Sequence, residues 1–133
     1  QQTSDITYRV FDFNRKDKNG QPRALHTDLA VEALNYTQQT DTQVAYAKDQ
    51  NTLNPMVSCP YFTTHFWELT QPLEQDLSQR DAFTIYICVA GQAQIANDWG
   101  SSTIKKGETL LIAAASTTVT ITTQGATLLE VTL

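Results

Sequence analysis

The sequence predicts an all-β domain of the jelly-roll type, a β-sandwich or barrel that carries one short helix. Two observations lead to this fold class. Runs rich in β-branched and aromatic residues fill the chain from Val57 onward, and turn-forming residues separate these runs at intervals of roughly 8–12 residues. With 133 residues, 41% of them hydrophobic, the chain is expected to form a single domain over residues 1–133.

The first expected strand covers residues 6–13, which are rich in aromatic and β-branched side chains, and a turn at residues 17–20 ends it. Alternation along such a strand would place Arg9 and Arg15 on one face, together with two phenylalanines. Two interpretations are open for this face. Arg9 is either a surface arginine that lies over apolar neighbours, or it lines a pocket in which its guanidinium holds a phosphate or enolate oxygen.

A short helix is expected over residues 29–34, after Pro22. Thr27 or Asp28 can cap its N-terminus, because both residue types accept hydrogen bonds from the first free backbone N–H groups. The apolar residues of this segment form a single stripe, which we expect to pack on a sheet face.

The remaining elements are expected to be strands. In the run 118–122, Val119 and Ile121 alternate with threonines, which predicts one buried face and one row of exposed hydroxyl groups. His65 shares a strand face with Tyr61 and Trp67, and we expect it to have a hydrogen-bonded packing role. The expected strands are residues 61–69, 83–89, 93–96, 109–113, 118–122 and 127–133.

The charge balance restricts the possible partners. Nine basic residues against fourteen acidic ones give a net charge of −5, which argues against nucleic acid as a partner. Residues 1–23 nevertheless carry five basic residues against three acidic ones. This basic segment indicates either a site for a small anion or an exposed basic loop. No apolar run approaches the ~20 residues of a membrane span, and no signal peptide opens the sequence, so we expect no membrane association.

Cysteine and histidine usage argues against a metal site and against a disulfide framework. Cys59 and Cys88 lie in apolar, strand-like runs and are expected to be reduced and buried in a cytoplasmic protein, with a disulfide as the alternative. His26 and His65 are far apart and lack metal-ligand spacing, so we predict no metal residues and no cofactor bound by this chain alone. Nucleophile-elbow and glycine-rich phosphate motifs are absent.

One stretch of the sequence resembles a known protein family in a highly specific way. Residues 1–15, QQTSDITYRVFDFNR, resemble a signature of the bacterial type I mannose-6-phosphate isomerases, and residues 16–26 resemble its continuation. Residues 106–113, KGETLLIA, are similar to a turn and strand of many cupin barrels. The resemblance implies that the predicted jelly roll is a cupin-like domain, the C-terminal portion of a larger isomerase.

This resemblance also implies an activity. The family interconverts mannose 6-phosphate and fructose 6-phosphate in the cytoplasm, moving a proton between C1 and C2 through an enediol. Arg9 takes the place of the family's catalytic arginine, and Arg15 is expected to bind substrate as a second cation. Six residues of straight strand span ~20 Å, so both arginines reach one hexose phosphate only if the chain bends or ends between them.

Zinc is implied for the full-length family enzyme, but its ligands are expected in an N-terminal catalytic portion that would precede Gln1. The isolated chain is therefore expected to be inactive, with that portion and the sugar phosphate as its partners. The alternative is a non-catalytic, cupin-like module that binds a carbohydrate or an anion, which the absence of metal ligands and the threonine-rich C-terminal face favour.

Overall fold

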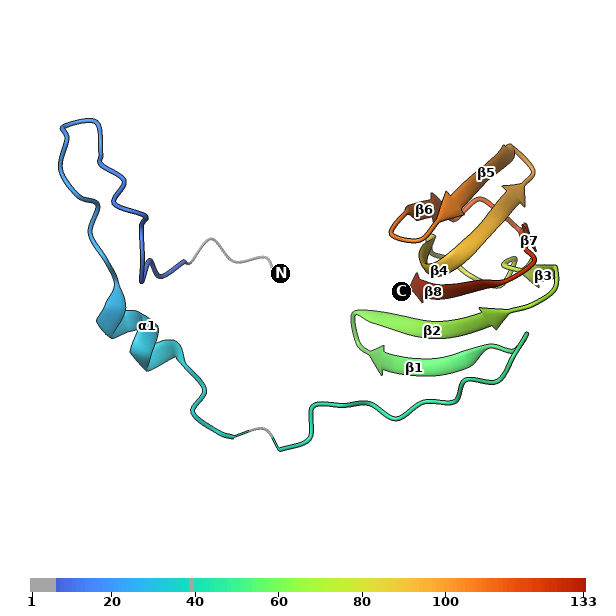
Figure 1. Ribbon diagram of the computed structural model, residues 1–133, viewed down its shortest axis with the longest axis horizontal. Helices are drawn as coiled ribbons and strands as arrows, with labels where there is room; N and C mark the ends of the chain where they lie inside the picture. Colours follow the sequence, from blue (N-terminus) through green and yellow to red (C-terminus); the bar gives the residue numbers. More distant parts are fainter. Residues whose placement is uncertain (1–6, 39) are drawn as a thin grey trace. The chain divides into compact units, whose positions relative to one another are not determined.

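The computed structural model describes residues 7–38 and 40–133, so the first six residues of the signature and Gln39 lie outside the description. The chain forms two compact units, residues 1–42 and residues 43–133. The strands of the described residues all belong to the second unit (Figure 1). The expectation of one domain over the whole chain stays a prediction.

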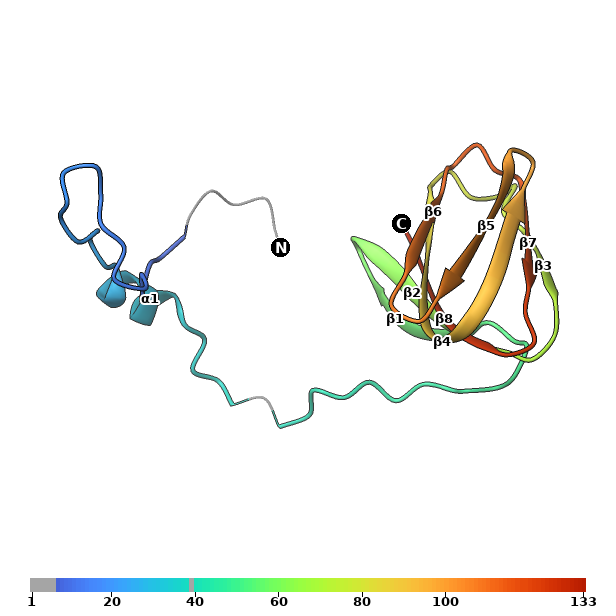
Figure 2. The same cartoon turned by 45° about the horizontal axis from the view of Figure 1, so that its top comes forward.

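The second unit consists of antiparallel strands that curl around a common interior (Figure 2). Their order is β1-β2-β8-β4-β7-β3, and β5 and β6 both pair with β4. Together with one short helix in the first unit, this mostly-β architecture confirms the predicted fold class. The strands are β1 (Asn54–Cys59), β2 (Phe62–Leu69), β3 (Leu73–Asp76), β4 (Thr84–Asn97), β5 (Gly100–Lys105), β6 (Thr109–Ile112), β7 (Thr118–Thr122) and β8 (Ala126–Thr132).

The long strand β4 joins the two halves of the curled sheet. Its first part pairs with β8 and β6, and its second part pairs with β5 and β7. A register shift between Cys88 and Ala90 bends the strand. At the bend Gly91 has a φ of 71°, and a Cβ at this position would overlap the carbonyl oxygen of Gly125. Only glycine fits here, because the conformation and the space both exclude a side chain.

Strand alternation builds the core. In β7, Val119 and Ile121 are fully buried while Thr120 and Thr122 are exposed, as the sequence predicted. The other large core residues come from neighbouring strands, so the interior is apolar along most of its length. The fully buried members with the largest side chains include Leu69, Tyr86, Ile95, Ile121 and Leu128.

The expected strands 61–69, 109–113, 118–122 and 127–133 match β2, β6, β7 and β8 to within one residue at each end, and the expectation fails in two ways elsewhere. The expected strands 83–89 and 93–96 are one strand, because the bulge before Gly91 bends β4 without ending it. Strands β1, β3 and β5 were not expected. Their sequences contain a proline, acidic residues and serines, and these strands form because each has a backbone partner in β2, β7 or β4.

The first unit differs more from expectation. Over its described part, residues 7–13 form no strand, so the predicted strand 6–13 is wrong there. The backbone of Arg9 pairs with His26 instead of with a sheet, and Phe13 and Asn14 have positive φ values of 51° and 57°. Two consecutive left-handed residues turn the chain and are incompatible with a strand.

The helix α1 (Thr27–Ala33) matches the expected helix in position but not in its cap. Its N-cap is His26, which makes no side-chain capping bond, so the expected caps Thr27 and Asp28 are wrong. The helix has no buried residue, and Leu29 is 49% exposed, so its apolar stripe is not covered within the first unit, and its expected packing on a sheet face stays a prediction. No helix among the described residues has the length and apolarity needed to cross a bilayer.

Candidate functional site

Arg9 lies where the chain closes a loop on itself. Its backbone N–H donates to Nδ1 of His26 over 3.2 Å, and the N–H of His26 donates to the carbonyl oxygen of Arg9 over 2.7 Å. The Arg9 side chain also donates from Nη1 to the carbonyl oxygen of Ala24, at 2.9 Å. These three bonds tie the two ends of the loop together and restrict the Arg9 guanidinium.

The chain reverses direction between Arg9 and Arg15. The N–H of Arg15 donates to the carbonyl oxygen of Asp12 over 2.9 Å, which closes a turn through Phe13 and Asn14. This turn brings the side chain of Arg15 back toward Asp12. The bend that a shared hexose phosphate would require is therefore present in the structure.

The carboxylate of Asp12 is the centre of this loop. Arg23 donates two hydrogen bonds to it, from Nε to Oδ2 over 2.6 Å and from Nη2 to Oδ1. Nη2 of Arg15 lies 3.2 Å from Oδ1, and Nε of Arg9 lies 3.7 Å from the same oxygen. The hydrogen bond from Arg23 lowers the pKa of Asp12 below its ordinary value of 3.8, against the opposing effect of burial. Asp12 is therefore ionised at neutral pH.

Two cavities differ in the charge of the side chains that line them. One, of about 570 Å³, lies in the second unit and has no charged side chain in its lining, whereas the other lies beside Asp12 and is lined by arginines. This second cavity measures about 530 Å³ and is lined by Arg9, Arg15 and Arg23 together with residues of the segment 7–13. The ring of Phe13 also contacts Arg15, whose guanidinium carbon lies 5.8 Å from the centre of this ring. Three guanidinium groups against one carboxylate make this loop suited to a small anion.

The comparisons with known proteins place the chain in a family. The family model of the mannose-6-phosphate isomerase cupin domain matches residues 52–131, more than half of the chain. The chain belongs to this family. The matched region lies outside residues 1–26, whose sequence suggested the same family, so the two observations come from different parts of the chain.

Individual relatives agree with this membership in the cupin-domain family. The chain is 31% identical over 113 residues to the mannose-6-phosphate isomerase of Streptococcus mutans, covering 84% of this chain and 35% of that protein. The crystal structure of the mannose 6-phosphate isomerase from Bacillus subtilis has a TM-score of 0.63 and 27% identity, covering 98% of this chain and 41% of that one. A cupin-2 domain protein from Shewanella frigidimarina, at 10% identity and a TM-score of 0.53, shares the fold over 64% of this chain and 82% of its own.

The chain spans little more than a third of the length of the curated relatives that it matches. Over residues 7–38 and 40–133, no three His, Cys, Asp or Glu side chains are grouped in a way that could hold a metal ion. The zinc that the family resemblance implies does not fit the described residues, and no chemical step of this chain is assigned to it.

A second polar cluster lies inside the barrel of the cupin domain, around Glu130 of β8. This carboxylate is fully buried. Its Oε2 accepts hydrogen bonds from the indole N–H of Trp67 at 2.7 Å and the amide of Gln75 at 2.8 Å, and Nη2 of Arg80 lies 2.7 Å from Oε1. The hydroxyl of Tyr86 in turn donates to Oε1 of Gln75 over 2.6 Å. Arg80 therefore balances a buried charge that other strands hold in place.

The expected role of His65 is met only in part. It shares the inner face of β2 with Trp67, but Tyr61 lies in the preceding turn and is 67% exposed. The Nδ1 atom of His65 is buried and lies 3.5 Å from Oε1 of Glu130. It has no hydrogen-bond partner in the described part of the chain. The sequence interpretation missed Glu130, although an acidic residue at an inward position of the apolar run 127–133 is a usable signal.

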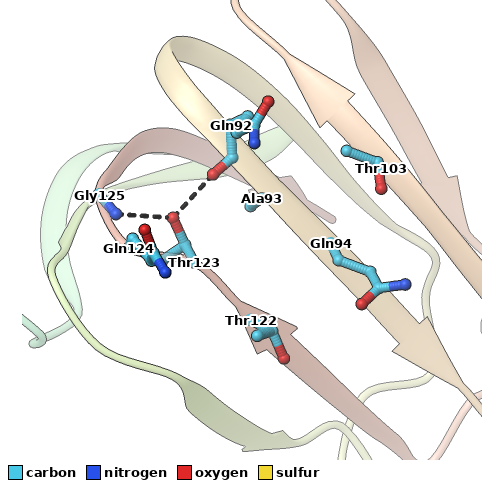
Figure 3. A pocket seen from close by; sticks show the side chains of 8 residues that line it. All are labelled: Gln92, Ala93, Gln94, Thr103, Thr122, Thr123, Gln124 and Gly125. Carbon is cyan, nitrogen blue, oxygen red and sulfur yellow. Dashed lines mark hydrogen bonds between the residues drawn. The ribbon is translucent and has the colours of Figure 1, made fainter.

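The uncharged cavity is lined by residues of β4 and β5, by the end of β7 and by the turn that follows β7 (Figure 3). Gln94 and Thr122 are paired residues of β4 and β7, and both side chains are exposed. The hydroxyl of Thr123 accepts from the N–H of Gly125 and donates to the carbonyl oxygen of Gln92, which fixes the end of the cavity. Its side chains are amides and hydroxyls without an acid or base, so this cavity can bind a neutral polar group but offers no proton transfer.

Proposed function

We propose that this chain is the C-terminal cupin portion of a cytoplasmic aldose–ketose isomerase that interconverts mannose 6-phosphate and fructose 6-phosphate. The observation that carries the proposal is the loop in which Arg9 and Arg15 approach the same oxygen of Asp12. This loop is built from the segment whose sequence resembles the signature of these isomerases. The names of the relatives support the same reaction.

In this proposal Arg9 is the catalytic residue contributed by the chain. The isomerisation removes a proton from C2 of the aldose, forms an enediol, and returns a proton to C1 to give the ketose. Negative charge develops on the sugar oxygens during this transfer, and the fixed guanidinium of Arg9 stabilises it where it appears. Arg15, whose side chain is 63% exposed, keeps donors that can bind the phosphate group.

The described residues contain no group of three side chains that could hold a metal ion. In this proposal the zinc of the enzyme is therefore held by a separate N-terminal catalytic portion, which is the partner of this chain. The isolated chain then binds no stoichiometric zinc and does not turn over substrate. Isomerase activity that is abolished by a chelator in the complete enzyme, and is missing from the isolated chain, is the expected result. Substrate turnover by the isolated chain would contradict this division of roles.

A second candidate function rests on the uncharged cavity of Figure 3. Its exposed amide and hydroxyl side chains, with Gln94 and Thr122 side by side, suit the hydroxyl groups of a neutral carbohydrate. In this case the chain is a carbohydrate- or anion-binding module without catalysis. Titration of the chain with mannose separates the two functions, because a binding module predicts chemical-shift changes at this cavity, and the isomerase portion predicts none.

A further inference from the structure

We propose that Asp12 and Arg23 are positioning residues, which together hold Arg9 and Arg15 in place for a phosphate monoester. This inference deepens the proposed function and rests on it for the identity of the anion as a sugar phosphate. It assigns roles to two residues, Asp12 within the signature stretch and Arg23 within its continuation, to which the family resemblance gave no role. In this role, Asp12 and Arg23 act on the anion through the other two arginines.

The burial of Asp12 is the first argument. Among the described residues of the first unit, Asp12 is the single buried one, with 7% of its surface exposed. Apolar side chains such as Phe11 and Phe13 are instead 64% and 73% exposed. A loop normally buries apolar groups first, because burying a charge is costly unless it is paired. This loop is organised around a carboxylate and its arginines, so the ion pairs determine its conformation.

The distribution of donors is the second argument. Arg23 occupies both oxygens of Asp12 with the two nitrogens of one edge, which is the strongest geometry for this pair. Arg9 and Arg15 each approach only Oδ1, at 3.7 Å and 3.2 Å, through one nitrogen. Since a guanidinium has five N–H donors, each of these two arginines keeps donors for a ligand. Arg23 therefore fixes the carboxylate, and the carboxylate helps to orient the other two arginines, each of which also donates to a backbone carbonyl oxygen, that of Ala24 for Arg9 and that of Asp12 for Arg15.

The charge of the cluster identifies the ligand class. Three guanidinium groups and one carboxylate leave a net charge of +2 on the groups around the cavity. A phosphate monoester carries a charge of about −1.5 to −2 at pH 7 and has three acceptor oxygens. Charge and donor geometry thus match a phosphate better than a neutral sugar or a monoanionic carboxylate.

Electrostatics and positioning make opposite predictions for one substitution. Asp12→Asn removes a negative charge close to the bound anion, so charge alone predicts tighter phosphate binding. If Asp12 positions Arg9 and Arg15, the same substitution removes one contact from each of these side chains. Arg9 keeps its bond to Ala24 and Arg15 its bond to the backbone carbonyl of residue 12, but both then have more conformational freedom to lose at the moment of binding. We expect the loss of order to dominate, and Asp12→Asn to weaken phosphate binding roughly five- to tenfold.

The test is a titration of the 133-residue chain with inorganic phosphate, in which binding is monitored through the NMR signals of the arginine Nε–H groups. Asp17→Asn is the matched control. Asp17 belongs to the same loop, and its Oδ1 accepts from the backbone N–H groups of Asn19 and Gln21, which an asparagine oxygen can also do. It changes the charge equally without contacting the arginines, so the control should bind phosphate at least as tightly as the wild type.

Arg23→Lys provides the second variant, because it keeps the charge and loses the two-nitrogen grip on Asp12. We expect it to weaken phosphate binding at least threefold and to broaden the Nε–H signals of Arg9 and Arg15. Phosphate affinity that rises in Asp12→Asn, or that is unchanged in Arg23→Lys, would overturn the inference. The result is separable from the proposed function, since a chain that binds phosphate as expected but supports no isomerase activity would refute only the isomerase.

Discussion

Arg80 is expected to contribute strongly to the stability of the barrel, because it is the counter-ion of the fully buried Glu130. Arg80→Met keeps most of the side-chain volume and removes the charge. Loss of one partner of a buried ion pair costs about 3–5 kcal/mol. Arg80 is 22% exposed, and Glu130 keeps its hydrogen bonds from Trp67 and Gln75, so we expect a loss near the lower limit, about 3 kcal/mol.

This loss is large for a domain of the size of residues 43–133, whose free energy of unfolding is expected to be roughly 5–13 kcal/mol. It corresponds to a fall in Tm of about 12–24 °C, measurable by circular dichroism together with urea denaturation. Lys106→Met, an exposed control that also removes one positive charge, should change the free energy of unfolding by less than about 0.5 kcal/mol.

The pair can also be tested by its coupling. Glu130→Gln in the Arg80→Met background removes the unpaired buried charge, and we expect it to restore about 1 kcal/mol or more relative to Arg80→Met alone. A single Arg80→Met variant that is as stable as the Lys106→Met control would refute the view that this ion pair balances a buried charge.

Three further predictions concern the barrel. Gly91→Ala should destabilise it by about 3 kcal/mol or more, because the methyl group meets backbone at a positive φ, whereas Gly107→Ala, at a φ of 89° in open space, should cost only about 1 kcal/mol by urea denaturation. Iodoacetamide should label the half-buried Cys59 in the native state and reach the buried Cys88 only on unfolding, and equal labelling rates would contradict this burial. Burial raises the pKa of Cys88 above 9.0 and that of Tyr86 above 10.0, so the folded state holds protons that the unfolded state loses first. Stability should therefore fall as the pH rises above about 9, and a constant free energy of unfolding between pH 8 and pH 11 would contradict these shifts.

Local sequence patterns predicted those strands whose own residues alternate clearly between apolar and polar. The strand at residues 118–122 has the expected bounds because its alternation of Val119 and Ile121 with threonines is unambiguous. Strand β3, with the sequence LEQD, has no such pattern, and its strand conformation depends on pairing with β7. Pairing partners far apart in sequence are not visible in a single segment, which is why β1, β3 and β5 were missed.

In the candidate site, too, the sequence identified individual residues but not the contacts between residues that lie apart in the sequence. The family resemblance pointed to Arg9 and Arg15 residue by residue, but the assumed strand would have held them far apart. Their approach to one carboxylate depends on the turn at Phe13 and Asn14, and only Asn14 is of a type that favours the left-handed conformation, so the residue types carry only part of the signal for this turn. Arg23 was missed because it lies eleven residues from Asp12 and meets it only after the loop closes.

The most direct test of the central proposal is the steady-state kinetics of Arg9→Lys in the enzyme that contains this chain. Lysine keeps the charge but lacks the planar fork that can hold an oxyanion with two hydrogen bonds. If Arg9 acts on the developing enediolate, kcat and kcat/KM for mannose 6-phosphate should fall together by roughly 10²–10³-fold while the protein remains folded. Wild-type values of both constants in a folded Arg9→Lys enzyme would contradict the assignment of Arg9 as its catalytic arginine.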